Sequence, residues 1–114
     1  GDPVDVLVIS PFSLLPGSVI RCRPVGLLRM TDESGKDAKI LAVPVDKLTT
    51  RYHQVHKPED LGKELLDTIA HFFTHYKDLD KGKWAKLEGW EGIESAKKEI
   101  MDSIKRYQQK KAVA

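Results

Sequence analysis

Residues 16–44, PGSVIRCRPVGLLRMTDESGKDAKILAVP, contain two apolar runs on either side of a short polar segment. The first run, residues 18–28, follows a strand pattern that is bent or interrupted at Pro24 and Gly26. The second run, residues 37–45, reads as another strand that ends around Pro44. The residues between them, 31–36, are polar and contain Gly35, which is typical of a hairpin loop. The stretch therefore predicts two long strands joined by a hairpin-type turn.

The flanking residues predict one more strand before this pair, and two helices with a short strand after it. Residues 4–9 are rich in β-branched side chains and stop at Ser10-Pro11. Apolar residues recur at helical spacing over residues 58–77 and 93–107, and residues 83–89 resemble a short strand. We expect a single α+β domain over residues 1–114, with strands that look antiparallel and two main helices. The tail, residues 108–114, is polar or small and is expected to fray.

Composition excludes several classes of protein. The 114 residues carry a net charge of only +2, which is too small to indicate nucleic-acid binding. A single cysteine, Cys22, excludes an internal disulfide framework and suits a reducing compartment. No apolar stretch reaches the roughly 18 residues that a membrane-spanning helix needs. We therefore expect a cytoplasmic protein with no membrane partner and no nucleic-acid partner.

Four aspartates in the first half are candidates for metal binding. Asp2, Asp5, Asp32 and Asp37 all fall at strand edges or in loops. Hard divalent cations such as Mg²⁺ take carboxylate oxygens as ligands, provided that the fold brings the carboxylates together. Asp is also common in turns, where it is simply solvated. Spacing alone leaves both interpretations open.

Three further residues could bind an anion beside such a metal. Lys39 lies two residues after Asp37, so on a strand both side chains point to the same face. This pairing suits a metal-bridged phosphate, and it equally suits a plain surface ion pair. Tyr76 and Lys77 close the first helix, where a lysine is also favoured by the helix dipole.

Other reactive side chains point to no chemistry of their own. His71 and His75 have the spacing of a zinc-protease helix, but Phe72 stands where the glutamate would be, so we exclude that chemistry. The pair is expected on a helix surface or at a subunit contact. Cys22 is expected to be a small buried hydrophobe.

Three segments, in this order, resemble the bacterial family I soluble inorganic pyrophosphatases. They are GDPVDVLV at residues 1–8, the stretch at residues 16–44 quoted above, and IAHFFTHYKDLDKGKW at residues 69–84. The first looks like the end of the family's Asp-Gly/Ser-Asp-Pro-x-Asp signature. The resemblance covers essentially the whole chain and implies an OB-like small β-barrel, incomplete here, with two main α-helices.

The resemblance also implies a reaction, the Mg²⁺-dependent hydrolysis of pyrophosphate to two phosphates. Asp2, Asp5, Asp32 and Asp37 match aspartates that bind metal, and Asp2 also matches the carboxylate that helps to deprotonate the attacking water. Lys39, Tyr76 and Lys77 match residues that bind phosphate oxygens.

By this resemblance the chain corresponds to the C-terminal two thirds of a family member, with the N-terminal third absent. The family's first signature aspartate would precede Gly1, so we expect these residues alone to be inactive or weakly active. Full-length relatives are homo-oligomers, and a hexamer assembled through the helix of His71 and His75 is expected for the full-length protein. The alternative that we weigh is an OB-type nucleic-acid-binding module.

Overall fold

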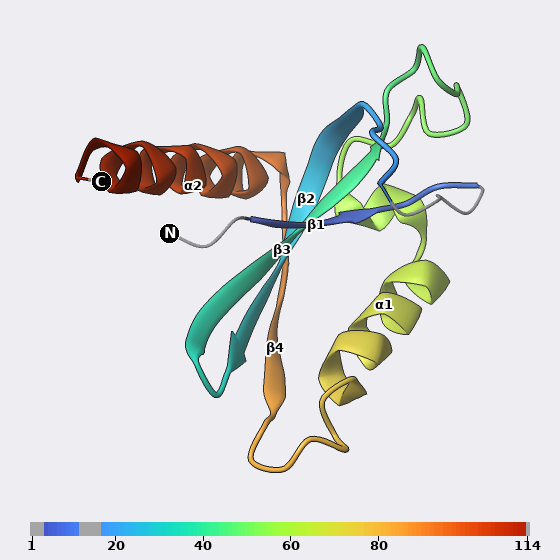
Figure 1. The fold of residues 1–114 in the computed structure, drawn as a ribbon. Coiled ribbons are helices and arrows are strands. Elements are labelled where there is room, and N and C mark those ends of the chain that lie inside the picture. Colours follow the sequence, from blue (N-terminus) through green and yellow to red (C-terminus); the bar gives the residue numbers. More distant parts are fainter. Residues whose placement is uncertain (1–3, 12–16, 114) are drawn as a thin grey trace.

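The computed structural model describes residues 4–11 and 17–113, with side chains as far as residue 110. Its strands are β1 (Asp5–Val8), β2 (Cys22–Asp32), β3 (Gly35–Pro44) and β4 (Ala85–Glu91). Its helices are the 3₁₀ turn η1 (Pro58–Leu61), α1 (Lys63–His75) and α2 (Ile93–Val113). Figure 1 shows α1 and α2 on opposite sides of the sheet, with much of α2 projecting beyond it.

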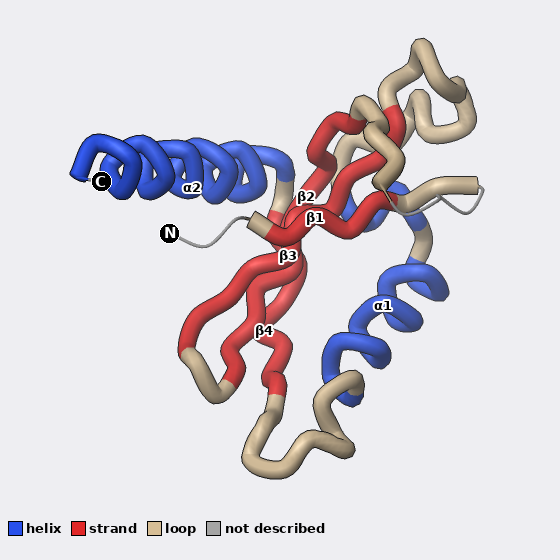
Figure 2. Tube along the Cα trace, viewed as in Figure 1, coloured by secondary structure: helices blue, strands red, loops and turns tan. Residues whose placement is uncertain are grey.

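The strands form one open mixed sheet in the order β1-β3-β2-β4 (Figure 2). β2 pairs antiparallel with both β3 and β4, while β1 pairs parallel with β3. The expectation of antiparallel strands is therefore wrong for β1, because β1 and β3 are not consecutive and need no hairpin between them. An open four-stranded sheet with two main helices confirms the α+β class and the incomplete barrel.

The β2–β3 hairpin buries apolar side chains on both faces, because alternate residues point to opposite sides. On the α1 face, Val25, Leu41 and Val43 pack against Leu66 and Ile69 of the helix. On the α2 face, a second cluster contains Leu27, Ala38, Ile40 and Ala96. Each helix is thus held by a stripe of the same two strands.

The long segment between β3 and η1, residues 45–57, is held to the sheet by Arg23. Its guanidinium donates to the backbone oxygens of Tyr52 and Val55, both at 2.6 Å. Val55 also belongs to the core on the α1 face. This contact holds the segment that leads into η1 and from there into α1.

Several expected boundaries are corrected. α2 continues to Val113, so the expectation of a frayed tail from residue 108 is wrong. Gln, Lys and Ala in that segment are good helix formers, and neither Pro nor Gly interrupts them. The first helix is divided at Gly62 into η1 and α1. Cys22 is half-buried rather than fully buried, and burial raises the pKa of its thiol.

Among the described residues, no helix is both long enough and apolar enough to cross a bilayer.

Gly26 lies where the backbone of β2 meets two other segments. A Cβ atom at this position would come within 2.3 Å of Cγ of Pro58 and within 2.7 Å of the backbone oxygen of Glu91. We predict that Gly26→Ala lowers the free energy of unfolding by about 1–3 kcal/mol, as overpacking of a core does. Urea unfolding followed by circular dichroism measures this change.

Gly92→Ala is the matched control, because a Cβ atom there meets nothing within 4 Å. The control variant should change the free energy of unfolding by less than about 0.5 kcal/mol. Equal stability of the two variants would contradict the packing described for Gly26.

Candidate functional site

Lys39 is held between two carboxylates on the α1 face of the sheet. Its Nζ atom lies 2.7 Å from Oδ2 of Asp5 and 3.1 Å from Oδ2 of Asp37. The parallel register places Asp5 directly opposite Lys39, and Asp37 is two residues away along β3. We call Asp5, Asp37 and Lys39 the Lys39 group. Its three members come from two strands and converge on one point.

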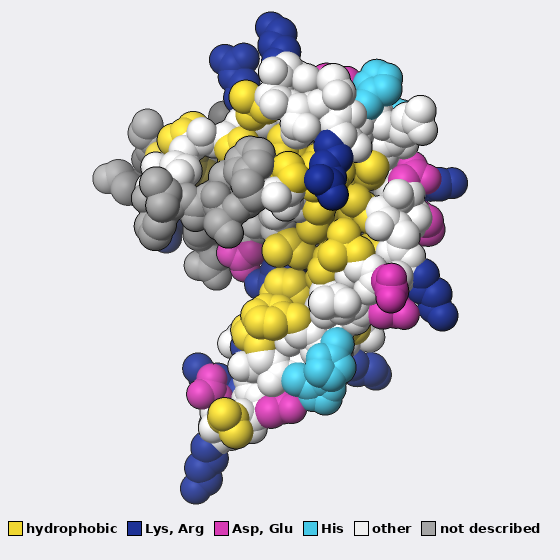
Figure 3. Space-filling model, turned by 90° about the vertical axis from the view of Figure 1, so that its right-hand side faces the viewer, with side chains coloured by type: hydrophobic (Ala, Val, Ile, Leu, Met, Phe, Trp, Pro, Cys, Tyr) yellow, Lys and Arg dark blue, Asp and Glu magenta, His cyan; other side chains and the backbone are white. Residues whose placement is uncertain are grey.

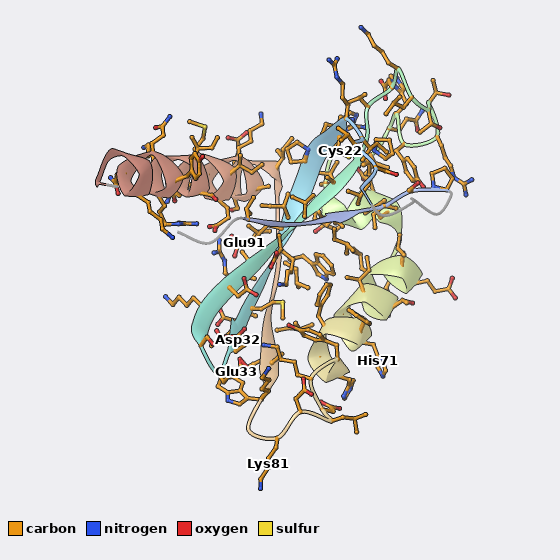
Figure 4. All side chains as sticks on the ribbon, viewed as in Figure 1. Cys22, Asp32, Glu33, His71, Lys81 and Glu91 are labelled. Carbon is orange, nitrogen blue, oxygen red and sulfur yellow. The ribbon has the colours of Figure 1, made fainter. Side chains whose placement is uncertain are left out.

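Lys77 is held by a second pair of carboxylates at the tip of the β2–β3 hairpin. Its Nζ atom lies 3.1 Å from Oδ2 of Asp32, and 3.0 and 3.2 Å from the two carboxylate oxygens of Glu33. Figure 4 shows Asp32 and Glu33 at the end of the hairpin that lies beside the C-terminal end of α1. We call Asp32, Glu33 and Lys77 the Lys77 group.

Two aromatic rings from α1 and its C-cap lie between the two lysines. The Nζ atom of Lys39 is 5.9 Å from the centre of the Phe73 ring, and Nζ of Lys77 is 5.5 Å from that of Tyr76. The Phe73 and Tyr76 rings themselves meet edge to face at 5.6 Å. These contacts place both lysines along one wall, with the acids of the hairpin beside them.

The carboxylates keep both lysines charged. Burial disfavours the Lys39 ammonium, but hydrogen bonds to Asp5 and Asp37 outweigh that effect and raise its pKa. The pKa of Lys77 is raised as well, chiefly by Glu33. The hydrogen bond from Lys77 lowers the pKa of Asp32, despite some desolvation of that carboxyl. At neutral pH the site therefore contains both kinds of charge, paired with each other.

The structure places six of the seven predicted site residues. Asp5, Asp37 and Lys39 form one group, and Asp32 and Lys77 belong to the other. Tyr76, with 41% of its surface exposed, lines the wall between the two lysines. Asp2 lies outside the described residues. Within the part of the chain that the structure describes, no three Asp, Glu, His or Cys side chains are arranged around one point as metal ligands.

His71 and His75 lie on the exposed surface of α1, with ring centres 4.6 Å apart. Figure 4 shows His71 on the side of α1 that points away from the sheet. Figure 3, which faces the α1 side, shows histidines next to exposed hydrophobic side chains. The pair is therefore separate from both lysine groups, as expected of surface residues.

Two residues of the site were not predicted from the sequence. Glu33 contributes both carboxylate oxygens to Lys77 and also accepts a hydrogen bond of 3.4 Å from the backbone of Trp84. Its only signal in the sequence is its position next to Asp32 in a polar loop. Phe73 belongs to the apolar stripe of the helix, and that pattern predicts only packing against the core. Its contact with Lys39 could not be predicted from it.

Comparison with known proteins gives a consistent result. The family model described as inorganic pyrophosphatase matches residues 1–108. The chain belongs to the inorganic pyrophosphatase family. It is 60% identical over 110 residues to the inorganic pyrophosphatase of Escherichia coli K12, and 58% identical over 110 residues to that of Vibrio vulnificus YJ016. Each match covers 96% of this chain and 62% of the relative.

Solved inorganic pyrophosphatases share the fold. The enzyme of Helicobacter pylori aligns with a TM-score of 0.91 and 49% identity, over 95% of this chain and 64% of that one. The Thermus thermophilus structure gives a TM-score of 0.88 and 42% identity, over 95% of this chain and 62% of that one. The expected family is therefore confirmed, and the chain spans about 62% of the length of the curated relatives that it matches.

The residues present fit a divalent cation of the kind that the inorganic pyrophosphatase family implies. Asp5 and Asp37 direct carboxylate oxygens at one shared point, and a positive charge stands there in the form of the Lys39 ammonium. Carboxylates are hard oxygen donors, which suit Mg²⁺. Asp32, in the Lys77 group, offers a further oxygen on the same hairpin.

Replacing Asp32 tests the charge pairing in the Lys77 group. Since the folded-state pKa of Asp32 is depressed, ionised Asp32 stabilises the fold above the ordinary Asp pKa of 3.8, and this contribution is lost as the pH falls through the folded-state value. We predict that Asp32→Asn is less stable than the wild type at pH 7, and that the difference shrinks below about pH 4. Urea unfolding at a series of pH values measures both quantities.

Asp67→Asn provides the control, because Asp67 is an exposed acid on α1. Asp67→Asn should change the free energy of unfolding only slightly at every pH. A difference for Asp32→Asn that is constant from pH 7 down to about pH 2 would show that the loss does not come from the ionised carboxylate.

Proposed function

We propose that this chain carries the metal-binding and phosphate-binding part of a Mg²⁺-dependent inorganic pyrophosphatase, which hydrolyses pyrophosphate to two phosphates. The observation that supports this most is the pairing of two lysines with the acids of one hairpin and β1 on a single face of the sheet. Alternating acids and ammonium groups suit a substrate that is itself a polyanion and that binds together with cations.

In this proposal the carboxylates of Asp2, Asp5, Asp32 and Asp37 hold Mg²⁺. When bound, the metal lowers the pKa of the attacking water and neutralises charge on the phosphate oxygens. Asp2 helps to take the proton from that water. Asp5 and Asp37 are already directed at one point by the register of β1 and β3.

Lys39, Lys77 and Tyr76 bind the diphosphate oxygens. The two ammonium groups neutralise negative charge that accumulates as the bridging P–O bond breaks, and the phenol donates a hydrogen bond. The wall of Phe73 and Tyr76 keeps part of the solvent away from this charge, which strengthens the electrostatic interactions. No covalent intermediate with the protein is needed.

The chain alone should hydrolyse pyrophosphate weakly or not at all. Its 114 residues include none of the positions to which the family resemblance assigns the first signature aspartate and the further acidic, lysine, arginine and tyrosine residues. We further propose a cytoplasmic protein that forms a hexamer when full length, with His71 and His75 at a subunit contact. Their exposure on α1 is compatible with that role.

An OB-type nucleic-acid-binding module is not favoured. Such modules use a basic groove with exposed aromatic side chains. Here the lysines of the site are already neutralised by acids, and the net charge is only +2.

The substrate class is tested with methylenediphosphonate, a diphosphate analogue that cannot be hydrolysed. We predict that calorimetry detects its binding to the chain in the presence of Mg²⁺, and that Lys77→Met weakens this binding at least about tenfold, as expected for the loss of a charged hydrogen-bond donor. Lys98→Met is the control. It removes the same charge from a lysine that pairs with Asp102 on α2, away from the site. Equal affinities of these two variants would contradict the assigned site.

A phosphate-release assay with Mg²⁺ and pyrophosphate tests the expected lack of activity. Turnover close to that of a full-length family enzyme would overturn that expectation, while leaving the assignment of the substrate intact.

A further inference from the structure

In the described part of the chain, the carboxylates that pair with Lys39 are both ones to which the family resemblance assigns metal. Its ammonium lies 2.7 Å from Asp5 and 3.1 Å from Asp37, and its side chain is only 15% exposed. Among the described residues, the structure gives Nζ no hydrogen bond to any other carboxylate. The cation position between these two acids is therefore taken by the protein's own charge.

Lys77 differs in one respect. It shares Asp32 with the expected metal site, but Glu33, which has no expected metal role, holds it with both carboxylate oxygens. If Asp32 turned to a metal ion, Lys77 would keep a partner. If Asp5 and Asp37 did so, Lys39 would lose both of its partners.

A divalent cation and the Lys39 ammonium compete for the same oxygens. A cation that takes Oδ2 of Asp5 and of Asp37 as ligands must replace the hydrogen bonds from Lys39, and two positive charges at that spacing repel each other. A largely buried ammonium without an anion is costly, so the displaced Lys39 needs a new negative partner. Phosphate oxygens of a diphosphate supply one.

We propose that Lys39 acts as a built-in counter-ion, which a divalent cation displaces from Asp5 and Asp37 and which then turns to the phosphate oxygens of the substrate. This inference rests on the proposed function and adds to it the order in which the cation and the diphosphate bind. The cation is bound first against the competition of Lys39, and its binding prepares the ammonium for the diphosphate. By linkage, the diphosphate must strengthen cation binding by the same factor.

The first test measures cation affinity in the absence of any phosphate. Mn²⁺ or Mg²⁺ is titrated calorimetrically into the wild-type chain, into Lys39→Met and into Lys98→Met. Removing the competitor should tighten cation binding by Lys39→Met measurably, by up to about fivefold for each ion pair that the cation no longer has to displace. Lys98→Met makes the same change of charge at an exposed position on α2, so its affinity should equal that of the wild type.

The second test follows Lys39 itself in the wild-type protein and does not depend on the folding of a variant. Trace acetylation of lysines, quantified by mass spectrometry, is compared with and without saturating Mg²⁺. Lys39 should react several-fold faster with Mg²⁺, Lys77 should change less because Glu33 retains it, and Lys98 should not change. Adding methylenediphosphonate to the Mg²⁺-loaded protein should slow the reaction of Lys39 again.

The outcomes separate this proposal from the function on which it rests. Cation binding with no change in Lys39 reactivity, or weaker cation binding by a folded Lys39→Met, overturns the exchange and leaves the metal site standing. Absence of cation binding by the wild type and by both variants overturns the metal site and the exchange together. Binding by Lys39→Met but not by the wild type supports the exchange.

Discussion

The register of β3 with its two neighbours decides where Lys39 and three acids of the site lie. Parallel pairing sets Asp5 opposite Lys39, and the antiparallel hairpin sets Asp37 opposite Met30 and Asp32 opposite Gly35. Since side chains alternate between the faces of a sheet, this register gathers the three acids and Lys39 on the α1 face. A shift by one residue would send them to the α2 face, where Ile40 and Ala38 now form the core. The same register therefore sets both which side chains form the apolar core and which form the charged site.

Helix α1 completes the site because its apolar face packs against the sheet. Leu66 and Ile69 pack on the sheet, and this packing carries Phe73 and Tyr76 over the charged end of the hairpin. Lys77, just beyond the helix, then reaches the hairpin tip. Neither lysine exists there as an isolated charge, since each pairs with two acids, and only Asp37 is a close neighbour in sequence of the lysine that it pairs with. A cation bound to any of these acids would therefore change the surroundings of the lysine that the acid pairs with.

Local patterns predicted much of this arrangement. Alternation in the stretch of residues 16–44 gave the hairpin and put Asp37 and Lys39 on one face, and helical spacing gave α1 with Lys77 at its end. The contact of Asp5 with Lys39 could not be predicted, because the register of a parallel pair between distant strands leaves no local signal. Glu33 was missed since a loop glutamate looks like any solvated residue until Lys77 is placed beside it. The helical tail of α2 was not predicted, because a polar C-terminal segment is typical of a frayed end even when, as here, its residues are good helix formers.

The central proposal is that Asp5 and Asp37 beside Lys39, and Asp32 beside Lys77, hold divalent cations at the end of the sheet that carries the hairpin turn. Paramagnetic Mn²⁺ tests it most directly, because it broadens the NMR signals of nuclei near the ion. In a ¹⁵N-labelled sample at low Mn²⁺ concentration, the account predicts selective broadening of the backbone amides of Asp5, Asp32 and Asp37, while that of Lys98 on α2 stays sharp. Broadening that spares the hairpin, or that spreads equally over α2, would contradict it.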